Sequence, residues 1–337
     1  MKEKGLHFVG IDISKETFDA AMIVSSDKEN IRTGYFPQDK DGFKRLLTWV
    51  KQNVGEEFKN TVYCMEHTGI YNIALMEFLC DQNLSVCLES GKQIKLSMGL
   101  QRGKNDKIDA RRIALYALKN EDDLRQWHAP RKEMKALKAL LTQRNMLLQT
   151  KVNLEQNINE LKSIGLKEQV KLLSKYNKGI KGIAKDIEQI EADINTLIKT
   201  DESLNKMFKQ ITGVPGIGSI TAIHLIVYTN EFKTVRGGKQ LACHCGVVPF
   251  EYTSGKSIKG KPRVHHAANK TLKTLLHMCA LAAIRMEGEF KKYYERKIAE
   301  GKHKMSVLNA IRNKLILRVA AIIKNDITYV ENYVYSV

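Results

Sequence analysis

The sequence predicts an α/β region followed by an all-α region, and three observations support this fold class. In roughly the first 126 residues, short apolar runs typical of strands alternate with helical patterns. In roughly residues 127–203, leucine and isoleucine recur at heptad spacing with little glycine. From about residue 204 onward, helical patterns are separated by glycine-rich turns. We therefore expect three segments, 1–126, 127–203 and 204–337.

The first segment is expected to form a sheet covered by helices. The expected strands are Leu6–Asp12, Thr17–Val24, Thr61–Glu66 and Leu84–Leu88, and the expected helices are Phe43–Val54, Tyr71–Asp81 and Asp106–Asn120. The tripeptide Ser14-Lys15-Glu16 separates the first two strands and predicts the turn of a hairpin. Strands interleaved with helices favour an α/β sheet layer.

The middle segment predicts a coiled coil. Leu140, Leu147, Leu154 and Leu161 repeat at intervals of seven, and beyond a break near Gly165 a second apolar series steps by threes and fours. The second series is Ile180, Ile183, Ile187, Ile190, Ile194 and Leu197. Two such helices form an antiparallel hairpin within one chain or an arm that joins two chains, and heptad spacing does not decide between them.

The last segment predicts helices and a turn suited to phosphate binding. Helical patterns cover Ser219–Tyr228, Leu272–Arg285 and Val307–Lys324. Before the first of these lies Gly213-Val214-Pro215-Gly216-Ile217-Gly218, which is typical of a helix–hairpin–helix motif. In such a motif the backbone amides near Gly216 and Gly218 would hold a DNA phosphate. The alternative is a helix–helix turn whose glycines allow close packing.

The composition narrows the class of partner. The chain has 55 Lys and Arg against 37 Asp and Glu, a net charge of +18, which favours nucleic acid or another anionic surface. No apolar run reaches the ~20 residues that span a bilayer, and the first residues lack a signal-peptide pattern. The six cysteines show no CxxC pair, so we expect reduced thiols. We therefore expect a cytoplasmic protein with no membrane partner.

Four acids provide the main functional prediction. Asp12 and Glu66 end apolar strand patterns, and Asp106 and Asp109 stand three residues apart at the start of a helix, on one helix face. Each acid alone is explained as a turn former, a helix cap or a solvated strand end. Together they are typical of a ribonuclease-H-like nuclease, whose converging carboxylates bind Mg²⁺ or Mn²⁺ for phosphoryl transfer. The competing acids, none of which ends an apolar strand pattern, are Asp19, Asp122 and Asp123.

Basic residues are concentrated in two parts of the sequence. Near the helical acids, the candidates for phosphate contact are Arg102, Lys104, Arg111 and Arg112. Between residues 252 and 286 the sequence has no acid, and the candidates there are Lys256, Lys259, Lys261, Arg263 and Lys270. We expect residues 250–263 to form a flexible basic loop that holds the DNA backbone. On these grounds alone, Ser254 is a loop hydroxyl, although a serine can act as a nucleophile toward a phosphodiester.

With these motifs in place, the chain resembles the insertion-sequence 110 family of transposases, which are relatives of the pilin-gene invertases. The N-terminal hallmarks are Gly10-Ile11-Asp12-Ile13-Ser14-Lys15, Glu66-His67-Thr68-Gly69-Ile70-Tyr71 and Lys104-Asn105-Asp106-Lys107-Ile108-Asp109-Ala110. The C-terminal hallmarks are Val214-Pro215-Gly216-Ile217-Gly218, Gly246-Val247-Val248-Pro249 and Thr253-Ser254-Gly255. Their order and spacing extend the resemblance over almost the whole chain.

The resemblance implies a RuvC-like domain, a coiled-coil linker and a C-terminal transposase domain. It implies that the four acids form a DEDD metal site and that Ser254 is the nucleophile, with Ser257 as the weaker candidate. Members of the family are understood to recombine donor and target DNA through a serine–phosphate link, guided by a non-coding RNA of the element. They assemble as dimers and tetramers, with composite sites shared between subunits.

Two other classes of function stay open on the sequence. A hydrolytic RuvC-like nuclease, such as a junction resolvase, would need the four acids and not Ser254. A non-enzymatic architectural protein would bind DNA through the glycine turn and the basic residues without metal. The acid quartet disfavours the architectural protein, whereas only the context of Ser254 disfavours the nuclease.

Overall fold

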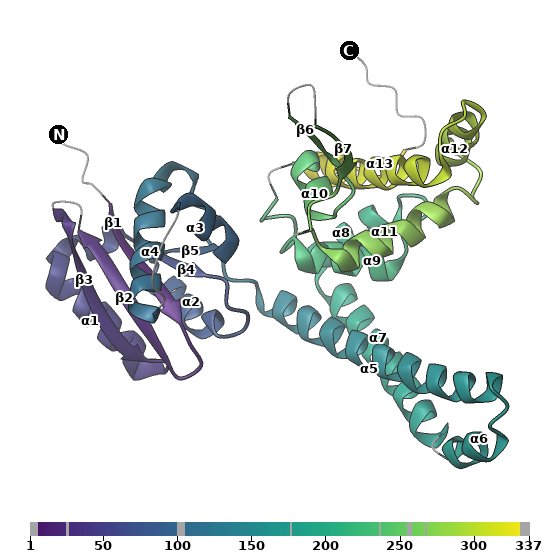
Figure 1. The fold of residues 1–337 in the computed structure, drawn as a ribbon, viewed down its shortest axis with the longest axis horizontal. Helices are drawn as coiled ribbons and strands as arrows, with labels where there is room; N and C mark the ends of the chain where they lie inside the picture. Colours follow the sequence, from purple (N-terminus) through teal and green to yellow (C-terminus); the bar gives the residue numbers. More distant parts are fainter. Residues whose placement is uncertain are drawn as a thin grey trace. The chain divides into compact units, whose positions relative to one another are not determined.

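The computed structural model describes residues 6–24, 27–99, 105–175, 177–235, 237–254, 258–266 and 268–330. The chain divides into two compact units, Met1–Ala129 and Pro130–Val337. The N-terminal unit contains a five-stranded sheet with its helices, and the C-terminal unit is mostly helical (Figure 1). This agrees with the predicted combination of α/β and all-α regions. The predicted middle and last segments both fall in the C-terminal unit, and their division into two domains stays a prediction.

The sheet of the N-terminal unit has the strand order β3-β2-β1-β4-β5. Its strands are β1 (His7–Ile13), β2 (Thr17–Val24), β3 (Asp27–Pro37), β4 (Thr61–Glu66) and β5 (Ser85–Glu89). The first three strands pair antiparallel, and β4 and β5 continue the sheet parallel to β1. This is the ribonuclease-H-like arrangement expected for the first segment. Strand β3 was not predicted, because this edge strand is largely exposed or half-buried and lacks an apolar alternation.

Helices cover both faces of this sheet. They are α1 (Lys40–Val54), α2 (Asn72–Asp81), α3 (Gly91–Ser97) and α4 (Asp106–Lys119), with short 3₁₀ turns at Gly55–Asn60 and Glu121–Asp123. Side chains alternate across a strand, so Val9 and Ile11 pack into the core that contains α1 and α2. Phe8 and Cys64 pack on the opposite face against Ile113 of α4. The three predicted helices are confirmed, whereas the short helix α3 was not predicted.

The C-terminal unit begins with a helical hairpin. The helices of this unit are α5 (Lys132–Ser163), α6 (Lys167–Ser174), α7 (Asn177–Thr200), α8 (Glu202–Thr212), α9 (Ser219–Tyr228), α10 (Gly238–His244), α11 (Lys270–Ala283), α12 (Glu289–Ala299) and α13 (Lys304–Asn325). Helices α5 and α7 lie side by side along their length (Figure 1). Ile187 and Ile194 of the predicted apolar series are buried, but Leu154 of the heptad series is 44% exposed. The apolar contact expected from the heptads is therefore incomplete within one chain.

The remaining helices form one hydrophobic core. Ile311, Leu315 and Val319 line the buried face of α13, at the helical spacing that the sequence predicts. The base of the hairpin joins this core through Met134 and Leu137. Among the described residues, no helix combines the length and the apolar character needed for a membrane span.

A β-hairpin stands where we expected a flexible basic loop. Its strands are β6 (Phe250–Ser254) and β7 (Ile258–Arg263), which pair antiparallel. The prediction of an irregular loop is therefore wrong for the described part of residues 250–263. Two residues obscured the pattern: Gly260 and Pro262 are poor strand formers, and Pro262 lies where the register of the ladder shifts.

Candidate active site

Two of the predicted acids lie at the same edge of the sheet. Asp12 is the penultimate residue of β1, and Glu66 is the last residue of the neighbouring parallel strand β4. Side chains two or four residues apart in a strand point to the same face of the sheet. Asp12 therefore shares a face with Phe8, and Glu66 shares it with Cys64, and this is the face that α4 covers. Parallel strands end at one edge, and this brings together two carboxylates that are far apart in the chain.

A close approach of helix and strand adds the other two acids. A Cβ atom built on Gly10 would lie 2.1 Å from the Ala114 nitrogen and 2.4 Å from the Ala110 oxygen. Only glycine admits this contact, since any side chain on Gly10 would collide with the backbone of α4. Asp106 and Asp109 lie in the first turn of α4, which Asn105 caps by accepting a hydrogen bond from the Ile108 amide. The contact at Gly10 therefore holds the first turn of α4 against the end of β1.

The pKa of Asp12 responds to the charges of the other three acids. The pKa of Asp12 is raised from 3.8 to about 6, first by burial and then by the negative charges of Asp106, Asp109 and Glu66. All three are thus close enough to Asp12 to disfavour its ionised form. The sequence predicted that these four acids form one site, which stays a prediction and is taken up as a proposal below.

A fifth acid, Asp19, belongs to the same cluster. It lies directly opposite Asp12 in the antiparallel ladder of β1 and β2. Burial and the charge of Asp106 raise its pKa, and Lys107 opposes this effect. The sequence does not single out Asp19, because it does not end an apolar run. The sequence held a partial clue: Asp12 lies two residues before the predicted turn Ser14-Lys15-Glu16 and Asp19 three residues after it, so a hairpin brings them near each other.

Two of the acids have partners in the protein. Asp109 accepts a hydrogen bond from Arg112, with 2.7 Å between Oδ1 and Nη1. The carboxylate of Glu66 lies over the backbone of Gly91, where an added Cβ atom would come within 2.0 Å of Oε1. The buried Asn72 holds the end of β4, because its Nδ2 donates to the Glu66 carbonyl at 2.8 Å while its Oδ1 accepts from the Thr68 amide and hydroxyl.

These donors fit a divalent metal ion in type and charge. Five carboxylates on one face repel each other, and hard oxygen ligands suit Mg²⁺ or Mn²⁺. Among the described residues, however, no three acidic, histidine or cysteine side chains already stand together as a ligand set. Two of the carboxylates already have contacts in the protein, since Glu66 lies against Gly91 and Asp109 is paired with Arg112.

The predicted phosphate contacts are placed unevenly. Arg111, Arg263 and Lys270 are exposed and available to a polyanion. Arg112 is mostly buried and paired with Asp109, so its prediction as a phosphate contact conflicts with its position in the structure. Arg102, Lys104 and Lys256 lie outside the described residues, as does Ser257. For Lys259 and Lys261 only the backbone, in β7, is described.

The glycine turn between α8 and α9 contains one glycine that is needed for close packing and one that is not. Gly216 has a φ of +86°, and a Cβ atom there would lie 2.6 Å from the Cys279 oxygen of α11. At Gly216 the packing explanation therefore holds, and phosphate binding is not needed to explain the glycine. Gly218 caps α9, is exposed and has open space around it, so a phosphate contact stays a prediction there.

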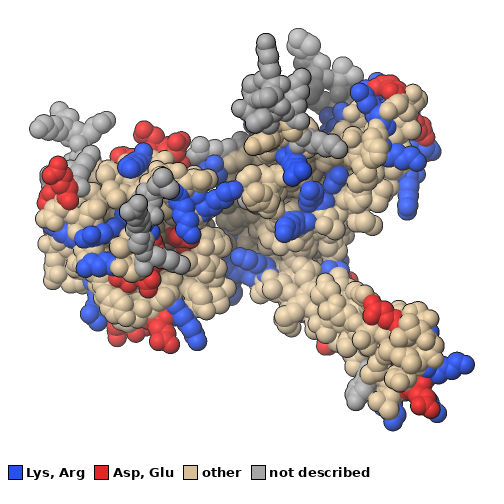
Figure 2. Space-filling model, viewed as in Figure 1, with Lys and Arg blue, Asp and Glu red and all other residues tan. Residues whose placement is uncertain are grey.

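The predicted nucleophile lies at the end of a strand. Ser254 is the last residue of β6, in the C-terminal unit, and its side chain is outside what the structure describes. In Figure 2, Lys and Arg side chains gather on the helical body from which this hairpin projects, and the Asp and Glu side chains on that body lie mainly near α12. The surface near the hairpin is thus basic in this view.

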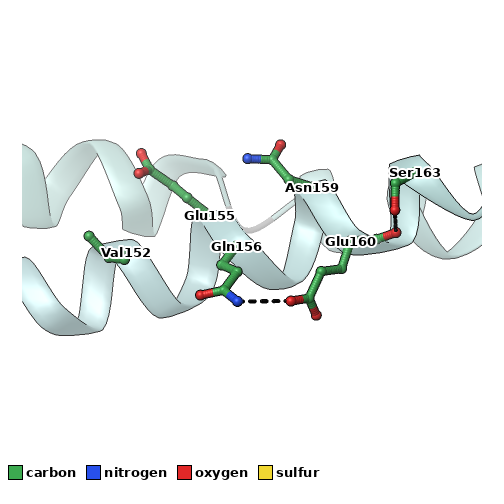
Figure 3. A pocket seen from close by; sticks show the side chains of 6 residues that line it. All are labelled: Val152, Glu155, Gln156, Asn159, Glu160 and Ser163. Carbon is green, nitrogen blue, oxygen red and sulfur yellow. Dashed lines mark hydrogen bonds between the residues drawn. The ribbon is translucent and has the colours of Figure 1, made fainter.

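A shallow groove of about 450 Å³ lies far along α5 from the core of the C-terminal unit. The residues that line it all belong to α5, and Figure 3 shows them along one side of this helix: Val152, Glu155, Gln156, Asn159, Glu160 and Ser163. The Gln156 amide and the Ser163 hydroxyl both donate to oxygens of Glu160. Three of the lining residues are therefore bonded to one another, and the groove contains none of the predicted site residues.

Comparison with known proteins supplies the family. The DEDD transposase profile of IS110 elements matches residues 9–164, which include all four acids. A second profile, described as transposase of the IS116/IS110/IS902 family, matches residues 209–295. The chain belongs to the IS110 family of transposases. The predicted identity as a transposase enzyme is thereby confirmed.

Some relatives of this IS110 transposase cover most of its length. It is 28% identical over 324 residues to the pilin gene-inverting protein of Moraxella bovis, which covers 95% of this chain and 96% of that protein. It is 22% identical over 265 residues to the transposase for insertion sequence element IS1533 of Leptospira borgpetersenii, covering 69% and 72%. A solved structure, T. thermophilus RuvC in complex with Holliday junction substrate, is 11% identical, with a TM-score of 0.27 over 36% of this chain and 99% of that chain.

Proposed function

We propose that this transposase cuts and rejoins DNA through a serine–phosphate intermediate, with Mg²⁺ or Mn²⁺ held by Asp12, Glu66, Asp106 and Asp109. The observation that carries the proposal is the raised pKa of Asp12 in β1, to which Asp106 and Asp109 of α4 and Glu66 of β4 contribute. Such a concentration of negative charge destabilises the protein unless a cation offsets it. A structural role alone gives no reason for it.

The residues have distinct roles in the proposed reaction. The Ser254 hydroxyl attacks the phosphorus of a phosphodiester, forming an Oγ–P bond while the bond from phosphorus to one deoxyribose oxygen breaks. The serine proton is lost, and the leaving deoxyribose oxygen takes up a proton. Divalent metal ions bound to the carboxylates would stabilise the charge that develops on the phosphate and on the attacking and leaving oxygens. Reversal with a different DNA hydroxyl rejoins the strand and releases Ser254.

We also propose nucleic-acid contacts outside the catalytic groups. Arg111, Arg263 and Lys270 are exposed cations that would bind backbone phosphates, and the exposed Gly218 amide would bind one more. These groups recognise charge and shape, not base sequence. A guide RNA that pairs with donor and target DNA would supply the sequence recognition that such contacts lack.

We propose that the protein acts as a dimer or tetramer. The part of the α5–α7 hairpin that lies away from the core leaves large apolar side chains exposed: Met146 and Leu172 are each 60% exposed, and Ile164 is 68% exposed. Apolar surface of this kind on a helical hairpin favours contact with another chain. The heptad prediction and the exposed Leu154 support the same assembly.

A single gel experiment tests the central proposal. The full-length protein, with the nucleic acid recovered from cells that express the complete element, is mixed with Mg²⁺ and end-labelled target duplex and run on a denaturing protein gel. A labelled band at the mass of the protein is expected, and it should be absent in Ser254→Ala and in Asp12→Ala. Asp122→Ala is the matched control, because Asp122 is an exposed acid of the same unit outside the cluster.

The hydrolytic nuclease remains the second candidate, because the four acids lie together in the N-terminal unit without Ser254. It predicts cleaved DNA with free ends and no labelled protein. Cleavage that continues in Ser254→Ala would contradict the serine mechanism and establish this alternative.

A further inference from the structure

The β6–β7 hairpin exposes two aromatic side chains that no function discussed so far uses. Tyr252 is 69% exposed and Phe250 is 48% exposed. Neither belongs to the hydrophobic core among the described residues of the C-terminal unit. The hairpin projects from the helices rather than lying on them (Figure 1). An isolated two-stranded ribbon is only marginally stable in water. Exposed aromatic side chains on such a ribbon therefore indicate a surface that binds a partner.

The ring of Tyr252 is held in place on the ribbon. Tyr252 pairs with Gly260 across the two strands. A Cβ atom on Gly260 would lie 2.8 Å from Cδ1 of the Tyr252 ring, so the ring covers the strand at the point where a side chain is missing. One side of the ring therefore contacts the backbone of β7 and the remainder faces solvent. A ring ordered before binding loses little entropy when a flat ligand stacks on it.

Charge indicates the chemistry of that ligand. Between residues 252 and 286 the chain has no acid, and the cations Arg263 and Lys270 are exposed near the hairpin. A partner that combines a π face with negative charge is a nucleotide, and exposed aromatic rings among cations are how proteins bind unpaired bases. A base inside a duplex is covered by its neighbours, so the rings and cations fit an unstacked base of a single strand.

We propose that Tyr252, supported by Phe250, is a stacking platform for an unpaired DNA base. Tyr252 and Ser254 are two residues apart in β6, about 7 Å along the strand. In the proposed reaction the platform would hold the base within a nucleotide or two of the phosphate that Ser254 attacks. This placement rests on the proposed function, whereas the stacking itself does not.

The first test measures affinity of the full-length protein for a fluorescein-labelled duplex with a four-nucleotide single-stranded gap. Tyr252→Ala should weaken binding roughly tenfold, the loss typical of one stacked base. Tyr252→Phe should keep the affinity, because the ring remains. Tyr35→Ala is the matched control, since Tyr35 is 63% exposed on β3 in the other unit, and it should have no effect.

The second test asks whether the lost interaction is with a base. The gap is rebuilt with abasic nucleotides, which keep the phosphates, and the effect of Tyr252→Ala should disappear on this DNA. A gap that contains 5-iodouracil should photocrosslink to Tyr252, as mapped by mass spectrometry. An equal loss on normal and abasic gaps would overturn the proposal, and so would a Tyr252 effect seen with single-stranded RNA and absent with DNA.

These results are separable from the proposed function. Stacking that depends on Tyr252 in a protein that forms no Ser254–DNA adduct would uphold the platform and contradict the serine mechanism. If the protein forms the Ser254–DNA adduct but Tyr252→Ala leaves its DNA affinity unchanged, the serine mechanism is upheld and the stacking platform is contradicted.

Discussion

The backbone of Gly10 in β1 contacts the backbone of α4 at Ala114. An added Cβ atom would lie 2.1 Å from the Ala114 nitrogen, a distance that no side chain tolerates. This contact determines how near the first turn of α4 comes to Asp12, and hence whether Asp106 and Asp109 join the cluster. A glycine two residues before an acid thus positions two other acids about a hundred residues away.

Replacing Gly10 should therefore damage both stability and the acid cluster. Gly10→Ala is expected to lower the free energy of unfolding by about 3 kcal/mol, because α4 must move away from the sheet. The measurement is urea denaturation followed by circular dichroism. The control is Gly182→Ala in α7, where no atom lies near the new methyl group, and a gain of about 0.5–1 kcal/mol is expected from helix propensity. A Gly10→Ala protein as stable as the wild type would contradict the contact.

Asp12 should make the metal-free protein less stable as pH rises. Its pKa is about 6 in the folded state against an ordinary value of 3.8, first because of burial and then because of Asp106. The folded protein holds this proton more tightly than the unfolded chain does. Stability is therefore lost as the pH rises above about 4, and the loss is complete above about pH 6.

Thermal melts of Asp12→Asn test this sign. Asparagine cannot ionise, so the melting temperature should exceed that of the wild type by several degrees at about pH 7.5 and by little at about pH 4. Added Mn²⁺ should raise the melting temperature of the wild type at the higher pH and leave Asp12→Asn nearly unchanged. A difference between variant and wild type that is the same at both pH values would contradict the raised pKa.

Arg112 and Arg111 should have opposite roles despite being neighbours. Arg112 neutralises Asp109 through the 2.7 Å contact, whereas Arg111 is exposed. Arg112→Gln should raise Mn²⁺ affinity on the order of fivefold, about 1 kcal/mol, because Asp109 is freed to bind metal. Arg111→Gln should leave Mn²⁺ affinity unchanged and weaken DNA binding, with a shallower dependence on salt. Calorimetric titration with Mn²⁺ separates the two, and equal effects of both variants would refute the assignment.

Arg131 should anchor the start of the C-terminal unit. Its guanidinium bonds Glu231, whose side chain is only 4% exposed, and it reaches Asp201 at 2.8 Å. Burial raises the pKa of Glu231, but the hydrogen bonds from Arg131 and Lys233 outweigh burial and hold the pKa below its ordinary value. The stabilisation from this carboxylate is thus present at neutral pH and is lost on acidification below about pH 4.5.

Removing Arg131 leaves a buried charge without its main partner. Arg131→Ala is expected to cost about 3 kcal/mol in unfolding free energy. Lys233→Ala removes the other cation from the same Glu231, but Lys233 is 51% exposed, and a loss of about 0.5 kcal/mol is expected. Denaturant titrations of both variants provide the comparison. Similar losses of unfolding free energy for Arg131→Ala and Lys233→Ala would contradict the larger role of Arg131.

Much of the N-terminal unit follows from local sequence. Apolar runs and helical periodicity predict β1, β2, β4, β5 and the three longer helices to within a few residues, because burial on one face leaves a period in the chain. Periodicity does not predict edge strand β3 or hairpin β6–β7, since neither packs a full face on a core. The heptads of α5 correctly predict a helix. They also predict that Leu154 is buried, but this side chain is 44% exposed because no neighbour in the same chain covers it.

The sequence predicts the positions of four acids, two at strand ends and two in the first turn of a helix, because these are local features with local signatures. For Asp19 the sequence held only a partial clue, and the register of β1 and β2 brings it to the other acids. The tertiary structure alone revealed that Arg112 holds Asp109. It likewise revealed that Gly10 admits α4 and that Gly260 supports the Tyr252 ring. Each of these is a contact between elements, and the distance between two elements depends on how their surfaces pack, which no periodicity within either one records.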